Sequence, residues 1–139
     1  MRILETIKNW IFRTPKNKLS YEDMVQIKEK GLVHFTDKCN VNSIKNEGVK
    51  PFPEKSMRRS EREFTWFYMN RSKKDIMDKY KIIKTKGSRA SYDVYFIIKN
   101  LSDDQMKNML YRKHDKAIVH KGVLKTDDME CYSVKELND

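Results

Sequence analysis

The 139-residue chain contains little cysteine, glycine or proline, and it has no long apolar run. Its two cysteines, Cys39 and Cys131, lie far apart and lack the spacing of a metal site. Because there is also no secretory signal, we expect a reduced chain in the cytoplasm. No stretch approaches the about 20 apolar residues of a membrane helix. Internal repeats, a glycine-rich phosphate loop, a metal cluster and a serine-triad motif are absent from the sequence.

Positive charge is what the chain has in excess, with 30 Lys plus Arg against 20 Asp plus Glu and a formal net charge of +10. This surplus favours association with a polyanion such as nucleic acid, or with an acidic protein or membrane surface. An AT-rich genome would produce the same lysine-rich composition, so both explanations stay open. Aromatic residues make up 11% and hydrophobic residues 38%, which argues against disorder and suits one modest core. The length predicts a single domain over 1–139.

Two helices are predicted before residue 31. Residues 2–13 carry an apolar stripe with basic flanks, which suits either a helix that meets a membrane or partner or a helix that docks on the protein's own core. The ordinary width of the stripe favours the second alternative. Ser20 is a predicted N-cap, with Asp23 completing an imperfect capping box for a helix over about 21–28. Gly31 ends this helix, so residues 1–30 form N-terminal helices and residues 31–139 the core.

The stretch 31–51 organises the rest of the chain. An apolar run over 32–36 predicts a strand that leads directly into a helix, and Gly48 ends that helix in the left-handed conformation. Free backbone N–H groups at the start of the helix predict a place for an anionic ligand. The strand brings His34 and Thr36 to this place.

A second strand is predicted over 64–70, the most aromatic part of the chain. Alternation puts Phe64, Trp66 and Tyr68 on one face and further apolar residues on the other, which is typical of a central strand. Beyond it we expect a helix to about Tyr80 and another from Ser102 to about Leu110. Further strands are predicted over 81–84, 92–98, 117–120, 123–125 and 129–134. Helices in the first half and strands in the second indicate an α+β fold.

Basic residues gather in two places. The predicted loop over 51–63 contains Lys55, Arg58, Arg59 and Arg62, and the next predicted helix begins with Lys73 and Lys74. The basic loop and the lysine pair could each hold phosphates of a nucleotide or of a nucleic-acid backbone. The alternative is a solvated basic surface, which charge runs usually are.

A family resemblance lies in the block HFTDKCNVNSIKNEGVKP. It resembles the first block of small ADP-ribosyltransferase-like domains, of the DNA-modifying toxin type and the RNA 2'-phosphotransferase type, which have a strand with His and then Ser or Thr, and a helix ending in Gly and Pro. The matching residues are His34, Thr36, Val41, Ile44, Gly48, Val49 and Pro51. The block covers about twenty residues and implies an ADP-ribosyltransferase-like split β-sheet core.

The resemblance also implies roles for individual residues. His34 would hold the ribose of NAD with Thr36 beside it, and Tyr68 would stack on the nicotinamide, with Trp66 and Phe67 as the next alternatives. The resemblance also implies a Glu, Asp or Gln at the head of a late strand, for which Glu130 is our choice and Asp127 and Asp128 are alternatives in the same region. Each residue has an ordinary structural alternative, namely a hydrogen-bonded strand histidine, a core aromatic or a surface acid.

Three functional hypotheses follow. The first is an NAD-dependent mono-ADP-ribosyltransferase that uses NAD as substrate and modifies a nucleic acid or protein, as a toxin or an effector in phage–host conflict. The second is a non-enzymatic basic protein that uses Arg58, Arg59, Arg62, Lys73 and Lys74 to bind nucleic acid or to inhibit a host nuclease or defence complex. The third is a 2'-phosphotransferase, which also consumes NAD. No metal site is predicted.

Overall fold

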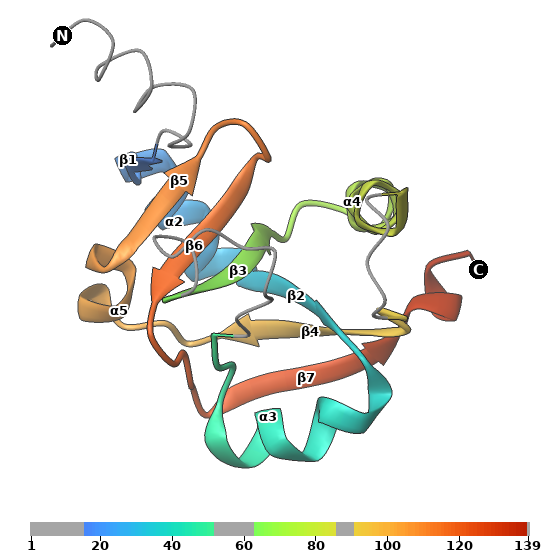
Figure 1. The fold of residues 1–139 in the computed structure, drawn as a ribbon. Helices are drawn as coiled ribbons and strands as arrows, with labels where there is room; N and C mark the ends of the chain where they lie inside the picture. The colour runs from blue at the N-terminus through green and yellow to red at the C-terminus, as the bar shows by residue number, and fades with distance from the viewer. Residues whose placement is uncertain (1–15, 52–62, 86–90, 139) are drawn as a thin grey trace, which may run out of the picture.

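A seven-stranded antiparallel sheet forms the centre of the molecule (Figure 1). The computed structural model describes residues 16–51, 63–85 and 91–138. The strand order across the sheet is β1-β5-β6-β3-β2-β4-β7. The strands are β1 (Lys16–Lys18), β2 (Leu32–Thr36), β3 (Phe64–Met69), β4 (Val94–Lys99), β5 (Met109–Arg112), β6 (Ala117–Lys121) and β7 (Asp128–Ser133). The helices are α2 (Tyr21–Lys30), α3 (Val41–Glu47), α4 (Lys73–Thr85) and α5 (Asp103–Lys107), with short 3-10 helices η1 (Lys38–Asn40) and η3 (Val134–Asn138).

Helix α2 begins and ends at the residues that the sequence indicates. The Ser20 hydroxyl accepts a hydrogen bond from the backbone of Asp23, whose carboxylate accepts one from the backbone of Ser20. At the other end, Gly31 has a φ of +81°, and a Cβ there would lie 2.4 Å from the carbonyl oxygen of Ile98. Glycine is therefore required both for the backbone conformation and for the close approach of α2 to β4.

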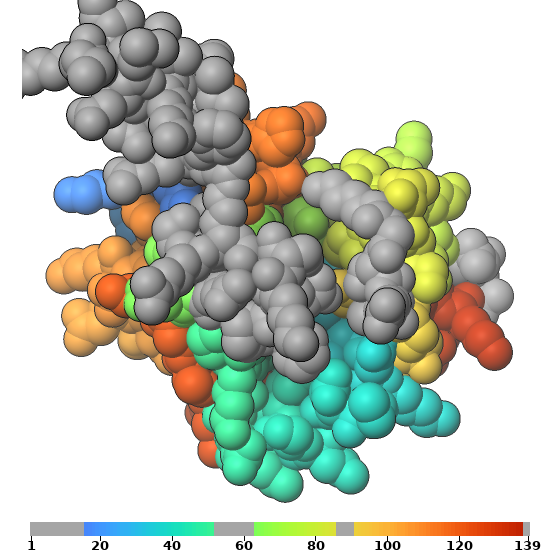
Figure 2. Space-filling view, in the orientation of Figure 1, coloured from blue at the N-terminus to red at the C-terminus, as the bar shows by residue number. Residues whose placement is uncertain are grey.

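The two faces of the sheet carry different helices. The α2 face bears Leu32, Phe67 and Phe96, which pack with Ile27 of α2 and with residues of α3 and α5 in the larger core cluster. The α4 face bears Val33 and Phe35, which pack with Ile76 of α4 and with Val134 of η3. In the space-filling view, α4 forms a flank that stands out at one side of the molecule (yellow-green, Figure 2).

The sheet is divided between β2 and β3. These strands share two residue pairs, Leu32 with Met69 and Val33 with Tyr68. Beyond these two pairs the strands separate. Strand β2 stays paired with β4 as far as Thr36, and β3 stays paired with β6 as far as Phe64. The two strands therefore form a fork, which opens from the Val33–Tyr68 pair toward Thr36 on one side and Phe64 on the other.

Most predicted elements are confirmed, and the fold is α+β as expected. The strand predicted over 81–84 is wrong, because Ile83 continues the buried side of α4 that begins with Ile76 and Tyr80. The helix predicted to reach Leu110 ends at Lys107 with Asn108 as its C-cap, and Met109 instead pairs with His120 as the start of β5. Residues 123–125 form an isolated bridge between Leu124 and Val49 instead of a strand.

Some predictions fall outside the part of the chain that the structure describes. These include the helix over 2–13 and most of the basic loop over 51–63. No element is predicted for residues 16–18, yet they form β1, which pairs with β5 through three residues. None of the described helices combines the length and the hydropathy that a membrane crossing requires.

Candidate functional site

His34 lies at the fork and bridges it. Its Nδ1 is 2.7 Å from the carbonyl oxygen of Trp66, so the ring takes the place of a missing backbone hydrogen bond between β2 and β3. Because the partner is a carbonyl, Nδ1 carries the proton and Nε2 remains an acceptor. Burial lowers the pKa of His34 from its usual 6.5, against a smaller upward effect of the bond to Trp66, so the imidazole is neutral near pH 7.

Thr36 is buried two residues further along β2. Its hydroxyl accepts a hydrogen bond from the side-chain amide of Asn40 at 3.2 Å. The next residue, Asp37, accepts bonds from the Ser91 hydroxyl and the Tyr92 amide at 2.9 and 2.8 Å. These contacts tie the end of β2 to the segment that precedes β4.

The anion site predicted at the start of the following helix is not formed there. The Lys38 amide, which would face the anion, donates instead to the Asp93 carboxylate at 2.9 Å. Asp37 adds a second carboxylate at the same turn. Two negative charges beside the turn repel an anion, and the Lys38 amide of the turn already has a partner.

His34 and Tyr68 point to opposite faces of the sheet. Tyr68 is paired with Val33, so these two side chains share the α4 face, and His34 next to Val33 points to the α2 face. The ring of His34 accordingly contacts Phe67, with ring centroids 5.4 Å apart. Trp66 shares the face of Tyr68 by alternation. The direct clamp expected between His34 and these two aromatics is therefore not formed.

Glu130 shares the face of Tyr68 but lies three strands away. It is paired with Ile97, which in turn is paired with Val33, and this places it about 14 Å from the Tyr68 position at the usual strand spacing. Its exposed carboxylate accepts a hydrogen bond from the Tyr132 hydroxyl, which raises the pKa of that tyrosine. The structure thus does not bring Glu130 together with His34 or Tyr68.

A different carboxylate lies beside the aromatic residues. The carboxylate of Asp115 is 2.9 Å from Nε of Arg112, and both side chains are largely buried, at 8% and 13% exposure. The Arg112 guanidinium stacks on Trp66, with Cζ 4.4 Å from the ring centroid. We refer to Trp66, Tyr68, Arg112 and Asp115 as the Trp66 cluster.

The charges of this cluster affect the pKa of Tyr68. Burial is the largest cause that raises its pKa to about 12, and the negative charge of Asp115 adds to the increase, while Arg112 opposes it. Lys79 of α4 lies over the ring, with Nζ 5.7 Å from the centroid. The hydroxyl of Tyr68 is consequently protonated at neutral pH and can donate a hydrogen bond.

Trp66 brings a further polar group to the cluster. Its indole Nε1 is buried and has no hydrogen-bond partner among the described residues, although a buried N–H normally has one. An acceptor on a bound molecule would satisfy this group.

The β5–β6 hairpin explains how Arg112 and Asp115 reach Trp66. Arg112 is paired with Ala117 at the end of the hairpin, and a four-residue turn containing Asp115 connects them. Lys116 completes the turn with a φ of +53°. Ala117 is fully buried and small, which leaves the space beside Tyr68 to the larger side chains. Sequence analysis missed Asp115, although it is the single acidic residue between Asp104 and Asp127 and lies two residues before a predicted strand.

The remaining predicted site residues are basic. Arg58, Arg59 and Arg62 lie outside the described residues. Lys73 and Lys74 occupy the first turn of α4 and are exposed. Within the described ranges, no group of three or more His, Cys, Asp and Glu side chains could hold a metal ion.

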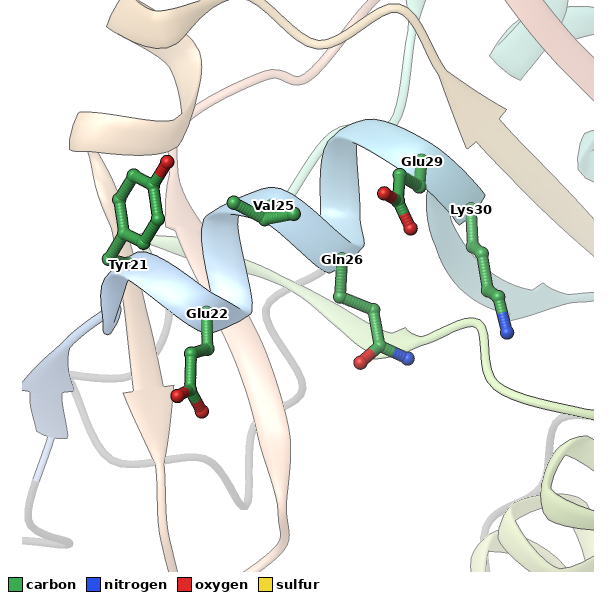
Figure 3. Close-up of a pocket in the computed structure, with 6 residues that line it drawn as sticks. All are labelled: Tyr21, Glu22, Val25, Gln26, Glu29 and Lys30. Carbon is green, nitrogen blue, oxygen red and sulfur yellow. The ribbon is translucent and has the colours of Figure 1, made fainter.

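A hollow on the outer side of α2 is separate from these residues. Side chains of this one helix line it (Figure 3): Tyr21, Glu22, Val25, Gln26, Glu29 and Lys30. It belongs to the α2 side of the sheet, whereas the Trp66 cluster lies on the α4 side. The hollow contains neither a buried titratable group nor an aromatic cage, and we assign it no role.

Comparison with known proteins adds no relative. No protein-family model, no curated protein and no solved structure matches this chain.

Proposed function

We propose that the protein is an NAD-dependent mono-ADP-ribosyltransferase that modifies a macromolecule, and that Asp115 supplies its carboxylate. The observation that carries the proposal is the Trp66 cluster, in which a buried carboxylate lies at the head of β6 beside two aromatic side chains. The resemblance of the block 34–51 implies a Glu, Asp or Gln at the head of a late strand. Asp115 meets this requirement beside Tyr68, whereas Glu130 lies three strands away.

The chemistry of the transfer fits these side chains. The bond between the ribose C1' of NAD and the nicotinamide nitrogen breaks, its electron pair leaves with nicotinamide, and the ribose becomes cationic. The Asp115 carboxylate stabilises this positive charge and accepts the proton of the attacking hydroxyl or amine. Arg112 holds the Asp115 carboxylate in position through their ion pair at 2.9 Å. Arg112 and Lys79 lie over the rings of Trp66 and Tyr68, so the cationic nicotinamide ring would stack there by displacing one of these cations.

His34 takes a more restricted part in the proposal than the sequence predicts. Since its side chain points to the α2 face, it can reach a ligand on the α4 face only through the opening of the fork. Its Nε2 is an acceptor for a ribose hydroxyl in that opening, with Thr36 at the outer end. The two halves of the sheet, joined by two residue pairs between β2 and β3, are compatible with a split-sheet core.

The experiment is transfer of label from radioactive NAD to DNA, RNA or cell lysate proteins. Asp115→Asn should reduce transfer about 100-fold or more, which is typical for loss of an acid–base group. Glu130→Gln is the matched control and should retain transfer. Wild-type protein that neither transfers label nor binds NAD would refute the proposal, and loss in Glu130→Gln with activity in Asp115→Asn would return the role to Glu130. Melting temperatures of both variants show whether each is folded.

A second candidate is a non-enzymatic protein that binds nucleic acid or inhibits a host nuclease or defence complex. The opposed directions of His34 and Tyr68 favour it, because they remove the direct clamp on NAD. Binding of nucleic acid without NAD, retained in His34→Ala, together with no transfer by the wild type, would decide for this candidate.

A further inference from the structure

One side of α4 is a continuous stripe of lysines. Lys73, Lys74, Lys81 and Lys84 are all exposed. At 3.6 residues per turn these positions fall within about 100° of the helix circumference, and the first and last are about 16 Å apart along the axis. We call these four residues the α4 stripe. Helix α4, which carries the stripe, is the flank that stands out in Figure 2.

The other sides of α4 have different composition. Ile76, Tyr80 and Ile83 pack on the sheet, and Lys79 lies over Tyr68. The acidic residues Asp75 and Asp78 fall outside the arc of the stripe. Most positive charges of the helix are therefore collected on one side, and Asp78 lies at the border of this side, four residues after Lys74 and three before Lys81.

The stripe is not neutralised by the part of the protein that the structure describes. Lys73, Lys74 and Lys81 form no ion pair with a described residue, and Lys84 donates to a carbonyl, that of Ser91, at 3.3 Å. Two of the lysines also lie in the first turn of the helix, where the helix dipole disfavours a cation. A local arrangement that opposes helix stability is expected where function requires it.

The composition of the stripe distinguishes between polyanions. A helix that lies on a membrane carries large apolar or aromatic residues beside its lysines, and a protein interface is centred on aromatic and arginine side chains. Between the lysines of the α4 stripe the side chain is Met77, which is half-buried, and the exposed Ile82 lies on another side of the helix. Lysines alone, spread along one line, suit a row of phosphates.

We infer that the α4 stripe binds the phosphate backbone of a nucleic acid, without reading its sequence. This inference does not require the transferase activity. If both hold, the stripe would bring the acceptor to the side of the molecule that carries Tyr68, because Lys79 connects α4 with that ring.

The test is fluorescence anisotropy with labelled 20-nucleotide single-stranded DNA, RNA and duplex DNA, without NAD. Lys74→Glu/Lys81→Glu reverses two charges of the stripe. Lys30→Glu/Lys107→Glu reverses two exposed lysines of α2 and α5, on the opposite side of the sheet, and is the matched control. The stripe variant should bind at least about 10-fold more weakly at 100 mM salt, and the slope of log affinity against log salt should fall by about 1.4–1.8. The control should stay within about 3-fold of the wild type.

Equal losses in both variants would overturn the inference, because net charge alone would then explain binding. Unchanged binding in the stripe variant would also overturn it. Vesicles of phosphatidylcholine and phosphatidylserine provide the third arm. If the stripe variant loses vesicle binding and keeps oligonucleotide binding, the surface belongs to a membrane instead. The transferase is tested separately, since Asp115→Asn should bind the oligonucleotides like the wild type.

Discussion

The buried ion pair of Arg112 and Asp115 is the residue-scale feature with the largest energetic consequence. Removal of one partner leaves the other charge buried and uncompensated, which typically costs about 3 kcal/mol of the free energy of unfolding. We therefore expect Arg112→Met to destabilise the protein by about this amount in urea unfolding at pH 7. Arg112→Met/Asp115→Asn should lose less than the sum of the single variants. Additive losses would show that the two side chains are not coupled.

His34 makes stability depend on pH. Its pKa in the folded protein is below the usual 6.5, so the unfolded state binds the proton first as the pH falls. Stability should therefore decrease from about pH 7 downward, and His34→Asn, which keeps a donor near Trp66, should make this decrease shallower. His114→Asn, in the exposed hairpin turn, is the control. The measurement is urea unfolding between pH 7.5 and 5.5, and an unchanged slope in His34→Asn would contradict the assignment.

At the scale of elements, two glycines with similar φ angles differ in how closely other atoms approach them. Gly122 has a φ of +84°, and a Cβ added there would meet no atom within 4 Å, whereas a Cβ on Gly31 would meet Ile98 at 2.4 Å. Gly122→Ala should cost about 1 kcal/mol, the usual penalty of a left-handed alanine. Gly31→Ala should cost at least about twice as much, because α2 must also move away from β4. Thermal or urea unfolding gives both values, and equal losses would show that α2 shifts without cost.

The sequence predicts helices and strands correctly where the alternation of apolar residues is long or where a capping residue marks the start. Alternation over 64–70 predicts β3 and the common face of Trp66 and Tyr68, and the capping residues Ser20 and Ser102 predict the starts of α2 and α5. The relation between His34 and Tyr68 was not accessible, because it depends on the register of β2 against β3. A shift of one residue in register reverses every side chain. Asp115 was missed since β5, which positions it, is stabilised by pairing with β6 and not by its own pattern.

At the scale of the whole molecule, the divided sheet is expected to unfold as one unit. The larger core cluster joins both halves, with Phe67 and Ile118 from one half and Phe96 and Ile98 from the other. Trp66 fluorescence, measured in a Trp10→Phe background, and far-ultraviolet circular dichroism should give the same urea midpoint. Two separate transitions would show that the fork divides the protein into independent parts.

The β1 edge of the sheet is poorly suited to pairing with a strand of another molecule. Strand β1 is three residues long and has lysines at both ends, so it covers the longer β5 and presents little backbone of its own. Short, lysine-bearing outer strands discourage addition of a foreign strand. A strand of another molecule therefore adds poorly to β1. This edge protects the concentrated protein against assembly into fibres.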